Sequence, residues 1–182
     1  MSDASNGPAD LDIATIVDVL NDHRVAYVVI GGVAAQAWAS SVGVDIRPTL
    51  DIDITPAPDA SNLERLSEAL HELEARTRTE SDPAGLPFDH TGESLARALT
   101  WTLICSAGPL DISIIPTGTE GFADFAQHAR VVIVNEVETP LADLADVIRS
   151  KRAANRPKDI EVLPALVEAL RRRDAGQADH QT

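Results

Sequence analysis

Polar and hydrophobic residues alternate strictly from residue 49 to residue 55, where Leu50, Ile52 and Ile54 hold the hydrophobic positions. This period of two predicts a β-strand with one face on a hydrophobic core. Short β-branched runs predict further strands at 25–30, 99–106, 110–115 and 130–134. Helical spacing and alanine-rich composition predict helices at 10–23, 33–41, 60–76, 122–125, 140–154 and 157–173. The element order therefore predicts an α+β fold, a mixed sheet flanked by helices with a helical C-terminal part.

Turn-forming residues separate these elements. Pro56 and Pro58 end the strand at 49–55, and the Ala-Gly-Pro sequence at 107–109 predicts a hairpin turn. The polar, turn-rich segment 80–92 predicts a mobile loop, and Pro164 should kink the last helix. We expect a core at 10–139, a helical C-terminal part at 140–173, and disordered ends at 1–9 and 174–182.

The composition favours a cytoplasmic globular protein. Hydrophobic residues make up 44% of the 182 residues, which is enough for a substantial core. The single cysteine, Cys105, excludes an intrachain disulfide and fits a reducing compartment. We find no signal-peptide pattern, and no apolar run approaches the roughly 20 residues that cross a bilayer. We therefore expect a cytoplasmic protein without a membrane partner.

The net charge of −14 argues against a general nucleic-acid binder, because phosphate neutralisation by basic residues drives such binding. The positive charges are unevenly distributed, however, since 8 of the 15 Lys and Arg residues lie within the last 34 residues. This clustering allows a local basic face on an acidic protein. The alternative is that these residues only solvate the exposed sides of helices.

Two acidic residues on the strand at 49–55 are the strongest chemical signal. Asp51 and Asp53 are two positions apart, so they project from the same face of a strand. Their mutual repulsion should raise the pKa of one of them, and divalent cations would remove that penalty. Carboxylate oxygens suit Mg²⁺, so this pair predicts a phosphoryl-transfer site with two Mg²⁺ ions.

Upstream of the acids, Gly31-Gly32 lies between the strand at 25–30 and an alanine-rich helix. Glycines lack a Cβ, so backbone N–H groups at a helix start can approach a polyphosphate closely. The alternative is a plain turn between strand and helix. Thr49 either bonds a phosphate or orients Asp51. Arg47 either clamps a phosphate or forms a salt bridge to Asp45 or to one of the catalytic acids.

The pattern Gly31-Gly32 followed by R-x-T-x-D-x-D from Arg47 to Asp53 resembles the polymerase-β-like nucleotidyltransferase fold. In this particular form it resembles the AbiEii-type and MenT-type nucleotidyltransferase toxins of prokaryotic toxin–antitoxin systems. The segment 151–159 is similar to the K-x-x-A-x-R-x-K-D segment found late in AbiEii-like proteins. Many members of the wider fold carry Gly-Ser where this chain has Gly31-Gly32, so a backbone contact or another hydroxyl must serve here.

The resemblance implies further site residues. Asp111, on the strand at 110–115, would be the third carboxylate, which helps to hold the metal and takes the proton of the incoming hydroxyl. An ordinary aspartate on the wet face of a strand is the alternative. Lys151 and Lys158 would neutralise the triphosphate or the leaving pyrophosphate, whereas Asp159 suits the first turn of its helix in any case.

These residues predict a metal-dependent nucleotidyltransferase that transfers NMP from an NTP to a hydroxyl. By the resemblance to MenT-type toxins, the acceptor would be the 3′ end of tRNA, and a cognate antitoxin protein would be a partner. A protein hydroxyl or a small-molecule hydroxyl, as in aminoglycoside nucleotidyltransferases, is a second possibility. A non-catalytic binding or regulatory module of the same fold is a third, although such a module has no need for three clustered acids.

Overall fold

The computed structural model describes residues 10–179, with side chains to residue 176. Its centre is a seven-stranded sheet with the order β3-β4-β5-β2-β1-β7-β6. Neighbouring strands are antiparallel except for the parallel pairs β2–β5 and β1–β7. The strands are β1 (Tyr27–Ile30), β2 (Ile52–Pro56), β3 (Arg76–Thr77), β4 (Thr100–Cys105), β5 (Gly108–Ser113), β6 (Arg130–Val134) and β7 (Val137–Leu141).

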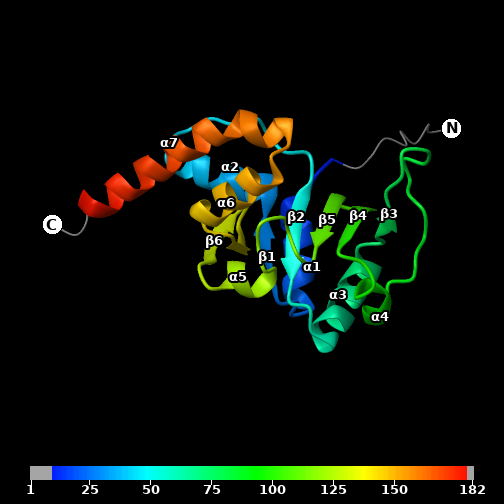
Figure 1. Cartoon of the computed structure of the whole chain (residues 1–182). Coiled ribbons are helices and arrows are strands. Elements are labelled where there is room, and N and C mark those ends of the chain that lie inside the picture. The colour runs from blue at the N-terminus through cyan, green and yellow to red at the C-terminus, as the bar shows by residue number, and fades with distance from the viewer. Residues whose placement is uncertain (1–9, 180–182) are drawn as a thin grey trace.

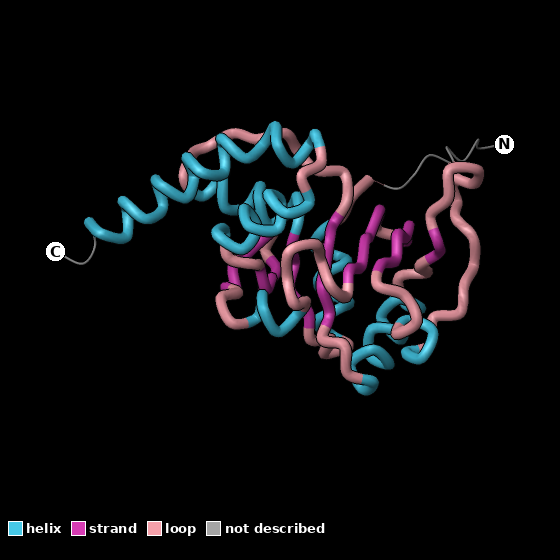
Figure 2. The backbone as a smooth tube through the Cα atoms, viewed as in Figure 1, coloured by secondary structure: helices cyan, strands magenta, loops and turns pink. Residues whose placement is uncertain are grey.

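Helices cover both faces of this sheet (Figures 1 and 2). One group, α1, α3 and α4, packs together, and Trp101 of β4 donates a hydrogen bond to the Leu95 carbonyl of α4. The helices α2, α6 and α7 pack together on the other face, beside α5. The helices are α1 (Ile13–Asp22), α2 (Gly31–Ser41), α3 (Ala60–Glu72), α4 (Gly92–Leu95), α5 (Phe122–Ala126), α6 (Leu144–Ala154) and α7 (Pro157–Asp179). The mixed sheet, flanking helices and C-terminal helices confirm the predicted α+β fold.

The buried side chains explain why β2 lies at the centre. Ile52 and Ile54 are fully buried and pack in one cluster with Leu63 and Leu66 of α3. Burying each such side chain contributes roughly 1.5 to 3 kcal/mol. Asn62 of α3 is also fully buried, and its amide bonds the N–H and carbonyl of Ala26 and the carbonyl of Ala57. This one side chain therefore ties the start of β1 to the end of β2.

The structure corrects the predicted start of the acidic strand. We expected strand from residue 49, but β2 begins at Ile52, and Leu50 is 76% exposed. The reason is local: Thr49 donates hydrogen bonds to the Asp51 carboxylate and carbonyl, and this turn competes with the sheet ladder. The strand also continues to Pro56, which pairs with Tyr27.

A second correction concerns the hairpin before the C-terminal helices. We predicted helix from Pro140, but Pro140 and Leu141 belong to β7, and α6 begins at Leu144 after its N-cap Asp143. Asn135 and Glu136 adopt positive φ values of 48° and 70° and turn β6 into β7. The sheet therefore includes β7, a strand that we did not predict.

The hairpin between β4 and β5 also differs from the prediction. We predicted its turn at 107–109, but Gly108 lies in β5 opposite Cys105, so the turn comes before Gly108.

The remaining differences lie at element ends. The short elements β3 and α4 were not predicted, and α3 stops at Glu72. We expected disorder over 174–182, but α7 continues to Asp179, since this stretch contains the good helix formers alanine and glutamine. Predicted disorder at 1–9 and at 180–182 lies outside the described residues.

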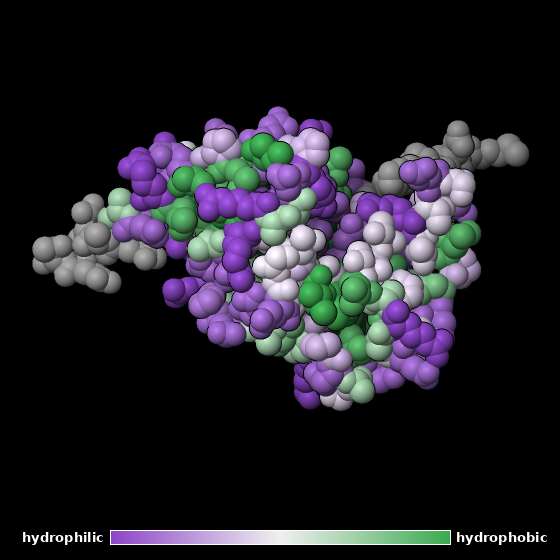
Figure 3. All heavy atoms as spheres, viewed as in Figure 1, coloured by the Kyte–Doolittle hydropathy of each residue, from purple (hydrophilic) through white to green (hydrophobic). Residues whose placement is uncertain are grey.

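The outer side of α7 is partly hydrophobic. Leu166 and Ala169 face the core, whereas Ile160 and Val167 are 51% and 42% exposed, and hydrophobic side chains gather over α7 in Figure 3. No described helix combines the length and the hydrophobicity needed to cross a bilayer.

Candidate active site

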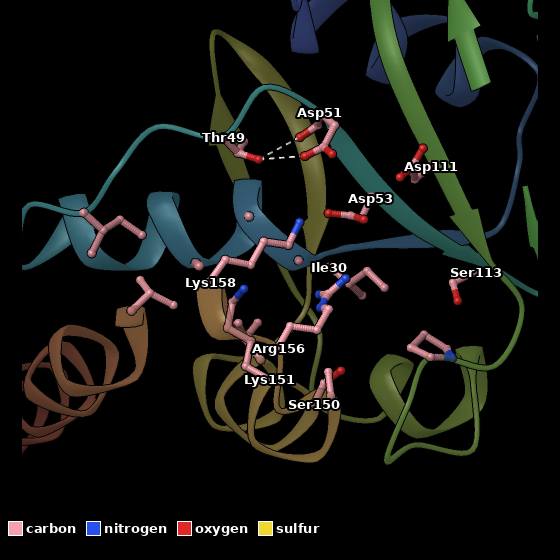
Figure 4. Close-up of a pocket in the computed structure, with 18 of the residues that line it drawn as sticks. Ile30, Thr49, Asp51, Asp53, Asp111, Ser113, Ser150, Lys151, Arg156 and Lys158 are labelled. Carbon is pink, nitrogen blue, oxygen red and sulfur yellow. Dashed lines mark hydrogen bonds between the residues drawn. The ribbon is translucent and has the colours of Figure 1, made fainter. Parts of the chain in front are cut away.

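The sheet brings two of the predicted acids together. Asp53 on β2 and Asp111 on β5 are register partners across the parallel pair, so their side chains project from the same face. Asp51 lies immediately before β2 and lines the same cavity. Figure 4 shows Asp53 between Asp51 and Asp111 beside this cavity. Two strands that are far apart in the sequence therefore supply the acids.

Asp53 is the most perturbed of these acids. Its burial, followed by the negative charges of Asp51 and Asp111, raises the pKa of Asp53 to about 6. The backbone N–H of Gly32 and the charge of Lys158 act in the opposite direction. Burial also raises the pKa of Asp111, although Arg78 opposes this shift. The site therefore holds more negative charge than its enclosed surroundings favour.

Asp51 is positioned by the turn that precedes β2. The Thr49 hydroxyl donates to Oδ1 of Asp51 over 2.8 Å. This bond matches one of the two roles considered for Thr49, that of orienting Asp51. The hydroxyl is consequently turned toward the acid, and it lies against the Cα of Gly32, where a Cβ would overlap it.

The start of α2 is shaped around the Asp53 side chain. Gly31 is the first residue of α2 and has φ of +64°, which favours glycine. A Cβ at this position would overlap the carboxylate of Asp53. The N-cap residue Ile30 offers no side-chain hydrogen bond to the first turn. The backbone N–H groups of this turn therefore face the acids at the positive end of a helix, where anions bind well.

Basic residues from the junction of α6 and α7 form the opposite wall. Asp159 is fully buried and pairs with Nζ of Lys151 at 3.1 Å and with Nε of Arg156 at 2.6 Å. Burial alone would raise the pKa of Asp159, but hydrogen bonds from Arg156 and Lys151 lower it. Asp159 thus fixes two cations beside the cavity. This is a structural role, but it acts through ion pairs as well as through the place of Asp159 in the first turn of α7.

The side chain of Lys158 extends toward the acids but forms no ion pair with them. It lies in the first turn of α7, and Figure 4 shows its side chain extending from this wall toward Asp53. No ion pair within 4.0 Å joins Lys158 to an acid among the described residues. Between the acids and the basic wall lies a cavity of about 770 Å³, large enough for a nucleotide.

Arg47 also lines this cavity. We considered that it forms a salt bridge to Asp45 or to one of the acids. Within residues 10–176, Arg47 makes no ion pair shorter than 4.0 Å. Its guanidinium therefore stays available to a ligand. All the predicted site residues, Gly31, Gly32, Arg47, Thr49, Asp51, Asp53, Asp111, Lys151 and Lys158, line this one cavity.

Sequence reasoning missed Arg78, which contacts Asp111 directly. One guanidinium nitrogen lies 3.1 Å and 3.4 Å from the two carboxylate oxygens. Arg78 follows the short strand β3, and its backbone N–H bonds the carbonyl of Thr102 on β4. No motif marks this arginine, because only the pairing of β3 with β4 brings it to Asp111. The prediction of β3 would have been the one available signal.

The carboxylates suit a metal ion, but they are not gathered as a ready-made ligand set. Asp53 is enclosed, is repelled by two other acids and has no Lys or Arg within 4.0 Å in the described part of the chain. A divalent ion bound by hard oxygen ligands would offset this charge. However, no three Asp, Glu, His or Cys side chains in the described residues are close enough to share an ion. The expected three-acid set is therefore not assembled, and Arg78 holds Asp111.

The fold of this chain is similar to the folds of solved nucleotidyltransferase structures. The solved structure of the lincosamide antibiotic adenylyltransferase LnuA with bound lincomycin aligns with a TM-score of 0.57 at 15% identity, over 88% of this chain and 99% of that chain. The antibiotic-resistance factor ANT(2'')-Ia aligns with a TM-score of 0.52 at 16% identity, over 93% of this chain and 94% of that one.

Comparison of the sequence alone adds nothing further, since neither known family profiles nor curated protein sequences match this chain. The structural likenesses confirm the expected nucleotidyltransferase fold. They do not distinguish the AbiEii and MenT toxins from other proteins of this fold.

Proposed function

We propose that this protein is a metal-dependent nucleotidyltransferase that transfers NMP from an NTP to a hydroxyl acceptor. One observation carries the proposal: Asp53 and Asp111 stand in register beside Asp51, across a cavity from the basic residues of α6 and α7. Phosphoryl transfer requires acids that hold cations and, across the cavity from them, groups that bind phosphates. A non-catalytic module would gain nothing from this costly concentration of charge.

Each wall of the cavity has its own task in this proposal. Asp51 and Asp53 would hold Mg²⁺, with Asp111 as a further ligand of a two-ion site, and bound Mg²⁺ would supply neutralisation of the triphosphate charge. The first-turn N–H groups of α2, together with Arg47 and Lys158, bind phosphate oxygens. Lys151, fixed by Asp159, stabilises the negative charge that develops on the leaving pyrophosphate. Asp111 accepts the proton of the acceptor hydroxyl.

A small-molecule hydroxyl is the acceptor that the charges favour. The protein carries a net charge of −14, and many of its basic side chains are already paired with acids, among them Arg149, Arg171, Arg172 and Arg173. Such a surface repels a nucleic-acid backbone. The cavity is also lined by the neutral hydroxyl residues Thr100, Ser113, Thr117 and Ser150. LnuA, which shares the fold, was solved with the small molecule lincomycin.

The 3′ end of tRNA is the second candidate acceptor, with the protein acting as the toxin of a toxin–antitoxin pair in the cytoplasm. It is supported by the resemblance of residues 151–159 and by the exposed residues Arg152 and Lys158, which have no acidic partner within 4.0 Å among the described residues. A strand end needs only a few such contacts near the cavity. A cognate antitoxin protein would then be a partner.

The decisive experiment supplies the purified protein with Mg²⁺ and each α-labelled NTP in turn. One arm contains total tRNA and the other contains lincomycin and a panel of aminoglycosides. We expect label on one acceptor class with release of pyrophosphate, and none with Asp53→Asn. If no NTP is turned over with any acceptor while the protein is folded, the catalytic proposal fails.

Growth separates the toxin hypothesis from antibiotic modification. The chain and its Asp53→Ala variant are expressed in a bacterium with and without an antibiotic. Arrest by the wild type alone favours the toxin, whereas antibiotic resistance conferred by the wild type alone favours a small-molecule acceptor. Equal growth of the two strains under all conditions contradicts both roles.

A further inference from the structure

Arg78 is anchored at the level of Asp111 by the sheet itself. Its backbone N–H donates to the Thr102 carbonyl over 2.9 Å, and Thr102 is the register partner of Asp111 on β4. The side chain thus needs only to reach across one strand to contact both oxygens of Asp111, at 3.1 Å and 3.4 Å. Both side chains are partly buried, with exposed fractions of 35% for Arg78 and 23% for Asp111.

The three acids are therefore not equivalent. Asp111 has an arginine partner, whereas Asp51 and Asp53 have no Lys or Arg within 4.0 Å in the part of the chain that the structure describes. A guanidinium that touches both oxygens of a carboxylate occupies the positions that a divalent ion would use. Asp51 and Asp53 are open to a cation, while Asp111 on β5 already has Arg78 beside it.

We propose that Arg78 is a positioning residue that holds Asp111 in place of a metal ion, so that a divalent ion using Asp111 must displace the guanidinium. This inference rests on the proposed function, because it concerns the same carboxylates. The resting protein then offers two unequal places for divalent ions. The stronger lies at Asp51 and Asp53, and the weaker includes Asp111 and competes with Arg78.

The expected size of the competition follows from the exposure of the pair. A partly exposed ion pair contributes up to about 1 kcal/mol, which corresponds to about a fivefold change in an equilibrium constant. Removing the guanidinium should tighten the weaker binding of divalent ions by about this factor. Lysine at the same position keeps the positive charge, and only one guanidinium nitrogen contacts Asp111, so Arg78→Lys should give a smaller change.

The test is a Mn²⁺ titration by calorimetry on the full-length protein without nucleotide, so that the readout is binding and not turnover. The variants are Arg78→Gln, Arg78→Lys, Asp111→Asn, the double variant Arg78→Gln/Asp111→Asn, and Asp53→Asn. We expect Arg78→Gln to tighten the weaker Mn²⁺ binding about fivefold relative to wild type. In the Asp111→Asn background the same change should have no effect, since the cycle isolates the pair.

Arg76→Gln is the matched control. Arg76 lies in β3, two residues before Arg78, and donates to the carbonyls of Ala84 and Gly85, but it makes no contact with Asp111. It should leave Mn²⁺ affinity unchanged, so any general effect of loosening this loop is measured separately. Thermal melts check that each variant is folded. If Arg78→Gln is unfolded, Arg78→Lys must still show a smaller increase.

The outcomes of this titration distinguish a failure of this inference from a failure of the proposed function. Unchanged Mn²⁺ affinity in folded Arg78 variants overturns this inference, and the proposed function stands if wild type binds Mn²⁺ and Asp53→Asn does not. If Arg78→Gln tightens Mn²⁺ binding equally in the wild-type and Asp111→Asn backgrounds, this inference is also overturned, because the effect is then a long-range effect of charge. Absence of Mn²⁺ binding in wild type and in Arg78→Gln overturns both proposals.

Discussion

Asp53 and Asp111 are register partners on the parallel strands β2 and β5, and the negative charge of Asp111 contributes to the raised pKa of Asp53. The core on the far face of the sheet fixes this approach, because Ile52, Ile54 and Leu110 are fully buried there. The protein cannot relieve the repulsion by moving one strand without exposing these side chains. The closeness of the two acids is therefore a property of the fold, and its cost can be measured.

Asp53→Asn should stabilise the metal-free protein at high pH. The pKa of Asp53 is raised from 3.8 to about 6, so the folded state binds this proton more tightly than the unfolded state. The resulting penalty, at most about 3 kcal/mol, is complete above pH 6 and disappears as the pH falls toward 3.8. Urea unfolding at pH 8 and pH 4.5 checks this: the gain of the variant over wild type should be large at pH 8 and small at pH 4.5.

Gly31→Ala should abolish nucleotide binding and destabilise the protein by more than the roughly 1 kcal/mol expected for a strained φ. The added Cβ would overlap the Asp53 carboxylate at the start of α2. Gly43→Ala is the control, because Gly43 has nearly the same φ of +67° but no atom within 4 Å of an added Cβ. Equal losses of stability and nucleotide affinity in the two variants would contradict a special role for Gly31.

Thr49→Val should lower kcat/KM about tenfold while leaving stability nearly unchanged, since it removes the hydrogen bond that orients Asp51. Thr49→Ser keeps the hydroxyl and should retain most of the activity. Steady-state kinetics and thermal melts of both variants check this prediction. A serine variant as impaired as the valine variant would instead point to the packing of the threonine methyl group.

Asp159→Ala should lower the free energy of unfolding by about 3 to 5 kcal/mol, because it leaves Lys151 and Arg156 without their buried partner. Glu168→Ala removes an exposed acid that pairs with Arg171 and Arg172 and should change stability little. The pKa of Asp159 is lowered, so its contribution is present above 3.8 and is lost as the pH falls further. Denaturant unfolding of both variants across this pH range is the measurement.

Lys158→Met should raise the KM for NTP about tenfold, with a smaller change in kcat. The reason is that Lys158 is proposed to bind phosphate in the ground state as well as in the transition state. Arg152→Met is the matched control, a basic residue of the preceding helix that does not line the cavity. The two variants carry the same net charge. A similar rise in KM in both would indicate a general effect of surface charge.

The local signals in the sequence were sufficient for the acids and glycines. Alternation identified Asp51 and Asp53, and the double glycine marked the start of α2, because both patterns depend on neighbouring residues. The pairing of Asp111 with Asp53 was expected from the resemblance, since no local rule specifies which strands become neighbours. Arg78 could not be found in this way, because its partner lies on another strand.

The errors at element boundaries have equally concrete causes. The segment from Val137 to Leu141 contains glutamate and proline, which are poor strand formers, so hairpin formation overrode its composition. Asp143 offered a helix-capping signal that we did not weigh against Pro140. At Thr49, a side-chain hydrogen bond to Asp51 outcompeted the alternation that the sequence presents.

The cavity draws its acids from strands completed by residue 113 and its fixed cations from the α6–α7 junction at residues 151–158. A ribosome that has made only the first part has produced the repelling carboxylates but not their basic counterpart. Chains that stop before this junction should therefore lack the activity that we propose, because they carry the acids without the basic wall of the cavity.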